Sequence, residues 1–185
     1  VRKLEKKSYL EYDLARSGVA SIGKYEISHK EVKSEKEYMA LIEKKVLDHL
    51  IADVPVGVFF SGGTDSTLIA AILHKHGVNL ETFSIKLDYK TDDAKYFKSI
   101  SDHLKLQSHV FTFDIPELES VYEEVMSKID EPSTDNSIFP TYFVSKKASE
   151  KVKGVLSGEG GDELFYGYPR SLEFAKMGDS VDYSI

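Results

Sequence analysis

The 185-residue chain contains no cysteine, and this absence excludes several kinds of site. Without thiols there is no disulfide, no thiolate metal centre, no iron–sulfur cluster and no catalytic thiol. The sequence also lacks a long hydrophobic run, because every apolar stretch is interrupted far short of the roughly 20 residues that span a bilayer. We therefore expect no membrane as a partner.

Positive charge is scarce as well. The 24 Lys and Arg residues are outnumbered by 31 Asp and Glu residues, which gives a formal net charge of −7. Such a chain lacks the basic surface typical of nucleic-acid-binding proteins, so we expect no nucleic acid as a partner. Residues 1–7 have no apolar segment behind them and do not resemble a signal peptide, so we expect a cytoplasmic protein. Because residue 1 is Val rather than Met, we expect the chain to be a piece of a longer protein.

The residues that are present have the balance of a folded domain, with 41% hydrophobic and 30% charged residues. From residue 35 onward, segments with the helical period alternate with short, continuous apolar runs typical of buried strands. The expected helices span residues 35–51, 67–76, 92–104, 116–129 and 140–151, and the expected strands span residues 56–60, 82–85, 108–113 and 154–156. This alternation predicts an α/β fold, in which a parallel sheet is flanked by helices on both faces as a Rossmann-type three-layer sandwich.

The chain is expected to fall into two parts. Residues 1–34 show no helical period and are interpreted as a lead-in with short extended pieces, following an upstream region that is missing. Residues 35–185 are interpreted as the domain that carries the function, shortened at its C-terminal end. At the start of this domain, Ser34 and Glu37 have the spacing of a capping box.

A glycine-rich turn, Ser61–Ser66 with the sequence SGGTDS, directly follows the first expected strand. Its glycines allow an anion to approach the backbone, and the free N–H groups at the start of the next helix favour a negative ligand. The hydroxyls of its serines and of Thr67 add hydrogen-bond donors. Asp65 would repel a phosphate unless a metal ion lies between them, which indicates Mg²⁺. The alternative is an ordinary strand–turn–helix in which Asp65 caps the helix. The turn matches neither a Walker A loop nor the dinucleotide-binding glycine pattern.

A second glycine-rich turn, Ser157–Glu163 with the sequence SGEGGDE, follows the last expected strand. Ligands of open parallel sheets bind beyond the carboxyl ends of the strands, so the two turns are predicted to form one site. The first turn would hold pyrophosphate, while the second would supply Asp162 to the metal and Glu159 to the reacting centre. The alternative is a flexible acidic turn without a function.

Together these segments resemble the C-terminal synthetase domain of the glutamine-dependent asparagine synthetase family. Four segments carry the resemblance: Asp53–Gly57; the loop Ser61–Ser66, which is similar to the pyrophosphate loop of N-type ATP pyrophosphatases; Asp130–Pro132 with Asp135, Ser137 and Pro140; and Leu156–Tyr168. The resemblance implies an adenine nucleotide alpha-hydrolase-like fold. It also implies an ATP-dependent ligase that adenylates a carboxylate, classically the aspartate side chain, releases pyrophosphate, and transfers ammonia to give the amide and AMP.

The resemblance assigns roles to individual residues. Glu159 and Asp65 would be catalytic, and Asp65 and Asp162 would hold Mg²⁺. The groups expected to bind ATP and pyrophosphate come from Phe59, Ser61, Gly62, Gly63, Asp65, Ser66, Ile85, Ser157 and Gly158. The small-molecule substrates would be ATP, the carboxylate acceptor and ammonia, and the protein could form a homodimer.

The chain also departs from the family pattern. Thr64 and Tyr166 are mild departures, whereas the missing cysteine is the nucleophile with which the family hydrolyses glutamine. A glutaminase domain upstream or in trans is therefore expected as the ammonia source. Three alternatives stay open: β-lactam synthetase chemistry, amidation of a sugar acid, and a domain that binds ATP without catalysis.

Overall fold

The computed structural model describes residues 3–26, 31–87, 93–131 and 133–177, and the chain divides into two compact units, residues 1–41 and 42–185. The first unit contains an antiparallel hairpin of β1 (Ser8–Asp13) and β2 (Gly18–Lys24), which confirms the expected extended pieces. The Asp13 carboxylate closes the turn by accepting hydrogen bonds from the N–H groups of Ala15 and Arg16, at 2.9 and 3.1 Å.

Helix α1 (Glu35–Asp48) begins at the capping box that the sequence predicts. The Glu37 N–H donates to Ser34 Oγ at 3.2 Å, and the Glu37 carboxylate accepts from the Lys33 N–H at 3.1 Å. The first bond satisfies a donor that the first turn of a helix leaves without a backbone partner, and the second ties the residue before Ser34 to the same turn.

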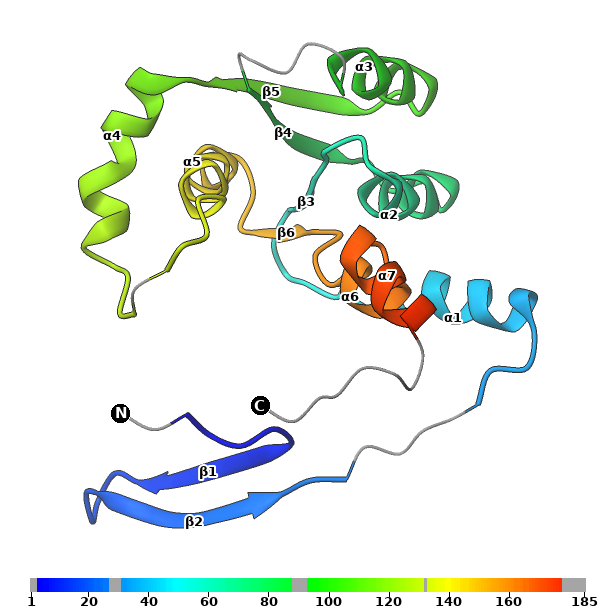
Figure 1. The fold of residues 1–185 in the computed structure, drawn as a ribbon. Helices are drawn as coiled ribbons and strands as arrows, with labels where there is room; N and C mark the ends of the chain where they lie inside the picture. The colour runs from blue at the N-terminus through cyan, green and yellow to red at the C-terminus, as the bar shows by residue number, and fades with distance from the viewer. Residues whose placement is uncertain (1–2, 27–30, 88–92, 132, 178–185) are drawn as a thin grey trace. The chain divides into compact units, whose positions relative to one another are not determined.

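The second unit is built on a four-stranded parallel sheet of strand order β5-β4-β3-β6 (Figure 1). Its elements are β3 (Val56–Phe59), α2 (Thr64–Lys75), β4 (Glu81–Leu87), α3 (Asp93–His103), β5 (Gln107–Phe113), α4 (Ile115–Met126), α5 (Ile138–Ser149), β6 (Gly154–Leu156), α6 (Gly161–Phe165) and α7 (Pro169–Met177). The parallel sheet and all of the expected strands are confirmed, with ends that shift by one or two residues. Residues 92 and 132, which the predicted helix and loop include, lie outside the described residues.

Helices α2 and α3 cover one face of the sheet. Val58 of β3 packs against Leu73 of α2, and Val58 lies beside Thr82 of β4 in register. The Thr82 hydroxyl is hydrogen-bonded to Ser108, which is in turn hydrogen-bonded to Ser101 of α3. Because neighbouring residues of paired strands project to the same face, α2 and α3 lie on the same side.

Helices α4 and α5 cover the opposite face (Figure 1). Phe83, which alternates with Thr82 along β4, packs against Val144 and Ala148 of α5. A second cluster joins Phe113 of β5 to α4 and α5. The three-layer arrangement predicted from the sequence is thus confirmed, and no helix among the described residues is long and apolar enough to cross a membrane.

Two helix termini, the end of α2 and the start of α4, lie where the local sequence predicts them. Gly77 ends α2 in the left-handed region at φ +70°, and the N–H groups of Gly77 and Val78 donate to the carbonyls of His74 and Leu73. This pattern satisfies the last carbonyls of the helix, as the glycine predicts. Asp114 caps α4 by accepting from the Glu117 N–H, also as expected.

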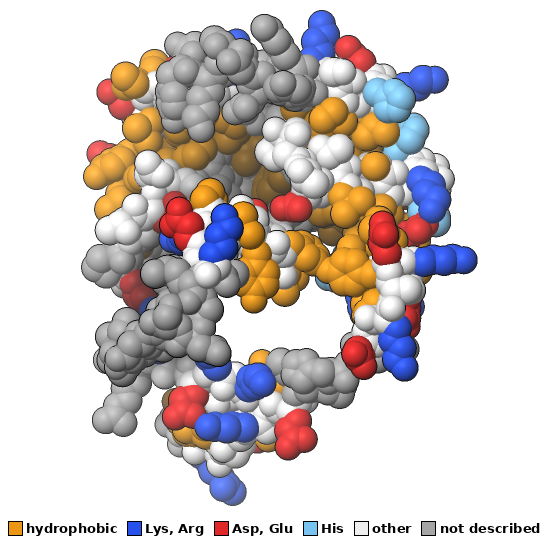
Figure 2. Space-filling view, turned by 45° about the vertical axis from the view of Figure 1, so that its right-hand side comes forward, with side chains coloured by type: hydrophobic (Ala, Val, Ile, Leu, Met, Phe, Trp, Pro, Cys, Tyr) orange, Lys and Arg blue, Asp and Glu red, His pale blue; other side chains and the backbone are white. Residues whose placement is uncertain are grey.

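Many charged side chains form mixed pairs, and Figure 2 shows Lys and Arg interspersed with Asp and Glu over the face that it draws. The densest group joins α4 to α5. The Lys146 and Lys128 ammonium groups lie 2.8 and 3.0 Å from the Glu124 carboxylate, and Lys128 donates to the Tyr142 hydroxyl at 2.9 Å. Hydrogen bonds from Lys146, Tyr142 and Lys128 lower the pKa of Glu124 from 4.5 to about 2.

This lowered pKa predicts a pH dependence of stability. Because the pKa is lower in the folded state, the contribution of Glu124 is fully present above its ordinary value of 4.5 and is lost as the pH falls toward 2. In urea unfolding, Glu124→Gln should have a lower midpoint than the wild type at pH 6, and the difference should shrink between pH 4.5 and 2. Glu119→Gln, an exposed change on the same helix, should show no such trend; a difference for Glu124→Gln that is independent of pH would contradict the assignment.

Candidate functional site

The first glycine-rich turn leaves three backbone N–H groups at the start of α2 without helical acceptors. The first helical bond runs from the Thr67 N–H to the Gly63 carbonyl at 3.0 Å, so α2 begins at Thr64, three residues earlier than the sequence predicts. The N–H groups of Thr64, Asp65 and Ser66 precede that bond and have no partner within the helix. They lie at the positive end of the helix dipole, which favours an anion.

Two serines hold the turn in shape. Ser66 is 5% exposed, and its hydroxyl lies 3.1 Å from the Ser61 hydroxyl and 3.3 Å from the Gly63 carbonyl oxygen. The Ser61 hydroxyl also accepts from the Gly63 N–H at 3.3 Å. The N-cap residue of α2 is Gly63, and no side chain forms a cap hydrogen bond. The alternative in which Asp65 caps this helix is therefore wrong.

The second glycine-rich turn packs directly against the start of α2. A Cβ atom built on Gly158 would lie 2.9 Å from Asp65 Cβ and 3.1 Å from the Ser66 nitrogen. A Cβ atom built on Gly161 would collide with the Asp65 carboxylate. These close approaches are possible because glycine has no side chain, and they bring the two turns together as the sequence predicts.

The turn after β6 continues into α6, which is fastened by its own polar contacts. The Gly167 N–H donates to the Asp162 carbonyl at 3.0 Å, and the Tyr168 hydroxyl donates to Glu163 at 2.8 Å. That hydrogen bond lowers the pKa of Glu163 and raises the pKa of Tyr168. Both hydrogen bonds join the segment that carries Asp162 to the residues that follow it.

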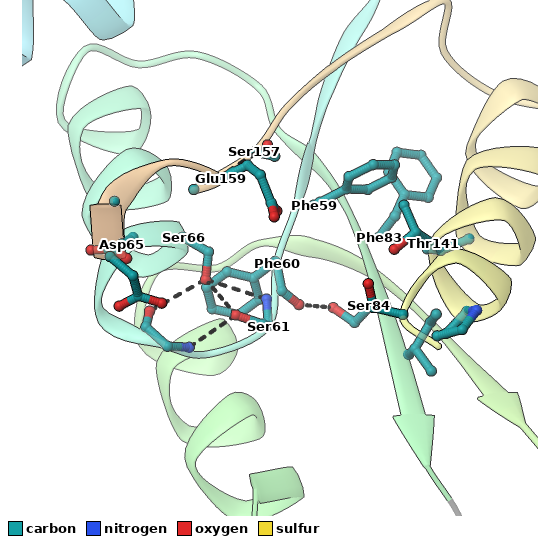
Figure 3. Close-up of a pocket in the computed structure, with 18 of the residues that line it drawn as sticks. Phe59, Phe60, Ser61, Asp65, Ser66, Phe83, Ser84, Thr141, Ser157 and Glu159 are labelled. Carbon is teal, nitrogen blue, oxygen red and sulfur yellow. Dashed lines mark hydrogen bonds between the residues drawn. The ribbon is translucent and has the colours of Figure 1, made fainter. Parts of the chain in front are cut away.

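The two turns line one cavity of about 1240 Å³ at the carboxyl ends of β3, β4 and β6. In Figure 3, Ser61, Asp65, Ser66, Ser157 and Glu159 lie toward one end, whereas Phe59, Phe83 and Thr141 lie toward the other. The cavity therefore has a polar end beside the helix start and a more apolar end beside α5.

The site residues predicted from the sequence meet in this cavity, with one exception. Its lining includes Phe59, Ser61, Gly63, Asp65, Ser66, Ile85, Ser157, Gly158, Glu159 and Asp162. Gly62 is not part of the lining; it has φ +78° and packs against the backbone of Phe97 in α3. Its left-handed backbone conformation is enough to explain why this residue is glycine, so no contact with a ligand is needed to account for it.

Sequence reasoning missed part of the lining. Ser84 and Lys86 of β4, Phe97 of α3 and Thr141 of α5 also border the cavity. The Ser84 hydroxyl donates a hydrogen bond to the Phe60 carbonyl, which joins β4 to the end of β3.

The cavity is strongly acidic. Asp65, Asp135, Glu159 and Asp162 line it, whereas Lys86 is the one cationic side chain among the described lining residues. Asp135 accepts from the Ser137 N–H at 2.9 Å, and hydrogen bonds to Ser137 lower its pKa. The resulting excess of negative charge requires compensation if an anion binds here.

Asp65 and Asp162 each bring to the cavity a carboxylate, the type of oxygen ligand that a hard divalent cation takes. Neither carboxylate forms a hydrogen bond or an ion pair within the described part of the chain, although both line the same cavity. No three Asp, Glu or His residues gather as a metal cluster among the described residues. Two carboxylates completed by phosphate oxygens and water are the donor set with which proteins commonly hold Mg²⁺.

Known proteins share this sequence pattern and this fold. A family model described as asparagine synthase matches residues 37–182. The Methanocaldococcus jannaschii protein named putative asparagine synthetase (glutamine-hydrolyzing) 2 is 35% identical over 182 residues, covering 95% of this chain and 35% of that protein. A Zea mays asparagine synthetase is 37% identical over 141 residues, covering 69% of this chain and 24% of that protein. The chain thus spans about a third or less of the length of these relatives.

One solved structure shows the fold independently. NMN synthetase from Francisella tularensis aligns with a TM-score of 0.53 at 18% sequence identity, covering 74% of this chain and 59% of that chain. At this level of identity the likeness concerns the arrangement of the sheet and its helices.

The packing of the two turns predicts the effect of a single methyl group. Gly158→Ala should destabilise the protein by about 1–3 kcal/mol, because the new Cβ meets backbone atoms that cannot move aside easily. Gly154→Ala is the matched control, since its Cβ would lie 3.7 Å from Val56 in ordinary contact. Urea unfolding at neutral pH measures both, and equal midpoints for the two variants would contradict the close packing.

Proposed function

Because the chain belongs to the asparagine synthase family, we propose that it forms the ATP-binding core of an amide-forming ligase. In the proposed reaction a carboxylate acceptor, the side chain of aspartate, is adenylated by ATP with release of pyrophosphate. Ammonia then displaces AMP and gives the amide, asparagine. The observation that supports this proposal is the meeting of two glycine-rich turns, one carrying Asp65 and the other Glu159 and Asp162, in one cavity at the start of α2.

The pyrophosphate part of ATP would lie at the first turn. The N–H groups of Thr64, Asp65 and Ser66 have no acceptor within α2, and these three residues and Ser61 line the cavity. When the acceptor oxygen bonds to the α-phosphorus, the bond to the bridging oxygen breaks and negative charge develops on the departing pyrophosphate. Donors that are already oriented toward that charge stabilise the transition state without reorganising.

Asp65 and Asp162 would hold Mg²⁺ beside those phosphates. Bound there, the ion would neutralise charge on the leaving pyrophosphate. The packing of Gly161 against the Asp65 carboxylate fixes one of the two proposed ligands at the edge of the helix start. This arrangement accounts for an Asp in a turn that otherwise favours anions.

The nucleoside would extend away from the turn toward β4 and α5. Main-chain groups of Phe59 and Ile85 would meet the adenine, and Ser157 and Gly158 would meet the ribose or the phosphate next to it. In support, Phe59, Ile85 and Val144 border the more apolar end of the cavity, where a purine ring would be buried against hydrocarbon.

Glu159 would act in the second half of the reaction. It lines the cavity in the turn after β6, so it can orient ammonia or accept the proton that ammonia loses when the new C–N bond forms and AMP leaves. We propose that a glutaminase domain upstream or in trans delivers the ammonia, because the named relatives are described as glutamine-hydrolyzing and this chain has no cysteine.

Isotope exchange tests the adenylation half. Wild-type protein should incorporate labelled pyrophosphate into ATP only when an acceptor acid and Mg²⁺ are present. Asp65→Asn and Asp162→Asn should each reduce the rate by about 100-fold or more, the scale on which loss of one electrostatic contact to developing charge acts. Asp102→Asn, an exposed change on α3 outside the cavity, should exchange at the wild-type rate.

The same assay distinguishes the alternatives. If exchange depends on a sugar acid, or on an acid that carries its own amine for ring closure, that acid rather than aspartate is the acceptor. Binding of ATP without exchange for any acid would favour a domain that binds nucleotide without catalysis. Normal exchange in both carboxylate variants would contradict the proposed roles of Asp65 and Asp162.

A second test separates Glu159 from nucleotide binding. Glu159→Gln should reduce amide formation from added ammonia by about 10²–10⁴-fold, the range typical of a positioned acid or base. Its affinity for ATP should stay at the wild-type value, since Glu159 is not proposed to contact the phosphates. Glu173→Gln, an exposed change on α7, serves as the control. Loss of ATP binding in Glu159→Gln would overturn this division of roles.

A further inference from the structure

The acidic cavity contains one cationic group whose role is unassigned. Lys86 is the one Lys or Arg among the described residues that line the cavity, and its side chain forms no hydrogen bond or ion pair in the described structure. Several exposed lysines of the second unit pair with carboxylates, as Lys44 does with Asp48 and Lys75 does with Glu43, whereas Lys86 does not. The Lys86 ammonium is thus available to an incoming anion.

Strand register places Lys86 farther along the sheet than the last residue of β3. Strand β3 ends at Phe59, which lies beside Phe83 of β4, whereas β4 continues to Leu87. Lys86 is three residues beyond Phe83, or about 10 Å farther along the strand. Strand β3 has already ended at that point, so Lys86 has no strand partner on the β3 side and lies beside Thr112 of β5 on the other side.

The face of the sheet is the second constraint. Side chains alternate along a strand, so Lys86 projects to the same face as Thr82, whose hydrogen bonds lead to Ser101 of α3. The loop approaches α3 on that face as well, because a Cβ atom built on Gly62 would lie 3.3 Å from Phe97 Cα. Lys86 and the start of α2 therefore lie on the same side of the sheet.

We propose that Lys86 is a phosphate-binding residue that contacts the β- and γ-phosphates of ATP, and hence the pyrophosphate product. The inference rests on the proposed function and adds to it a cation for the terminal phosphates, supplied by β4 rather than by either glycine-rich turn. An ammonium on a flexible stem of four carbons suits this position, because it can reach across the loop and meet phosphate as a compact point charge. It also offsets part of the negative charge that ATP would bring to a cavity lined by four carboxylates.

Calorimetric titration of the intact chain with ATP, inorganic pyrophosphate and AMP, each with Mg²⁺, tests the proposal. Lys86→Ala should weaken ATP and pyrophosphate binding by about tenfold, the scale of one charge-assisted hydrogen bond, and leave AMP binding unchanged. Lys86→Arg should retain most of the affinity. Lys151→Ala removes the same charge from an exposed position outside the cavity and should bind all three ligands as the wild type does.

Each other outcome has a defined meaning. Equal losses for AMP and ATP would overturn the proposal by moving the contact to the α-phosphate or the base. Unchanged ATP and pyrophosphate binding in Lys86→Ala would overturn it while leaving the proposed function intact. Wild-type protein that binds no ATP would overturn both. Lys86→Gln keeps a polar side chain without its charge and repeats the test if Lys86→Ala misfolds.

Discussion

The contact between the turn after β6 and the start of α2 is the constraint on which the rest of the site depends. Strand β6 pairs with β3 in a parallel register that places Val56 beside Gly154 and Val58 beside Leu156. Both strands therefore end at the same edge of the sheet, and each glycine-rich turn begins there. Gly158 and Gly161 then allow the second turn to approach Asp65 more closely than any side chain would permit. Two segments far apart in the sequence thereby share one cavity, and either turn alone would supply only half of the proposed chemistry.

Electrostatics gives this contact a second consequence. Packing the turns together concentrates carboxylates at the place where the backbone offers bare N–H groups, so the cavity combines strong local donors with an acidic lining. A phosphate ligand is compatible with that lining only if its charge is offset by the helix start and by added cations. If a phosphate ligand binds here, the acidic lining favours an accompanying metal ion, and Lys86, the one cationic side chain among the described lining residues, would offset part of the charge.

The sequence predicted features that depend on neighbouring residues and missed features that depend on the order of strands. The SGGTDS and SGEGGDE turns, the Asp114 cap and the Gly77 helix end are local patterns, and each is found where expected. The early start of α2 was missed because apolar periodicity begins only at Leu68, although the backbone is already helical at Thr64. Lys86 and Thr141 were missed because no local pattern tells that β4 lies beside β3 or that α5 borders the same edge.

Strand order also explains why the cavity forms at this edge. From β3 the chain moves outward through β4 to β5, with α2 and α3 on one face, and then returns to the other side of β3 as β6, with α4 and α5 on the opposite face. Crossover connections in parallel sheets are right-handed, so a reversal of direction moves the helices to the other face. The strand order therefore reverses between β3 and β6, and a crevice forms at such a switch point, beyond the carboxyl ends from which the two glycine-rich turns leave. The position of the site therefore follows from topology, whereas its chemistry follows from the glycines and carboxylates that the sequence places there.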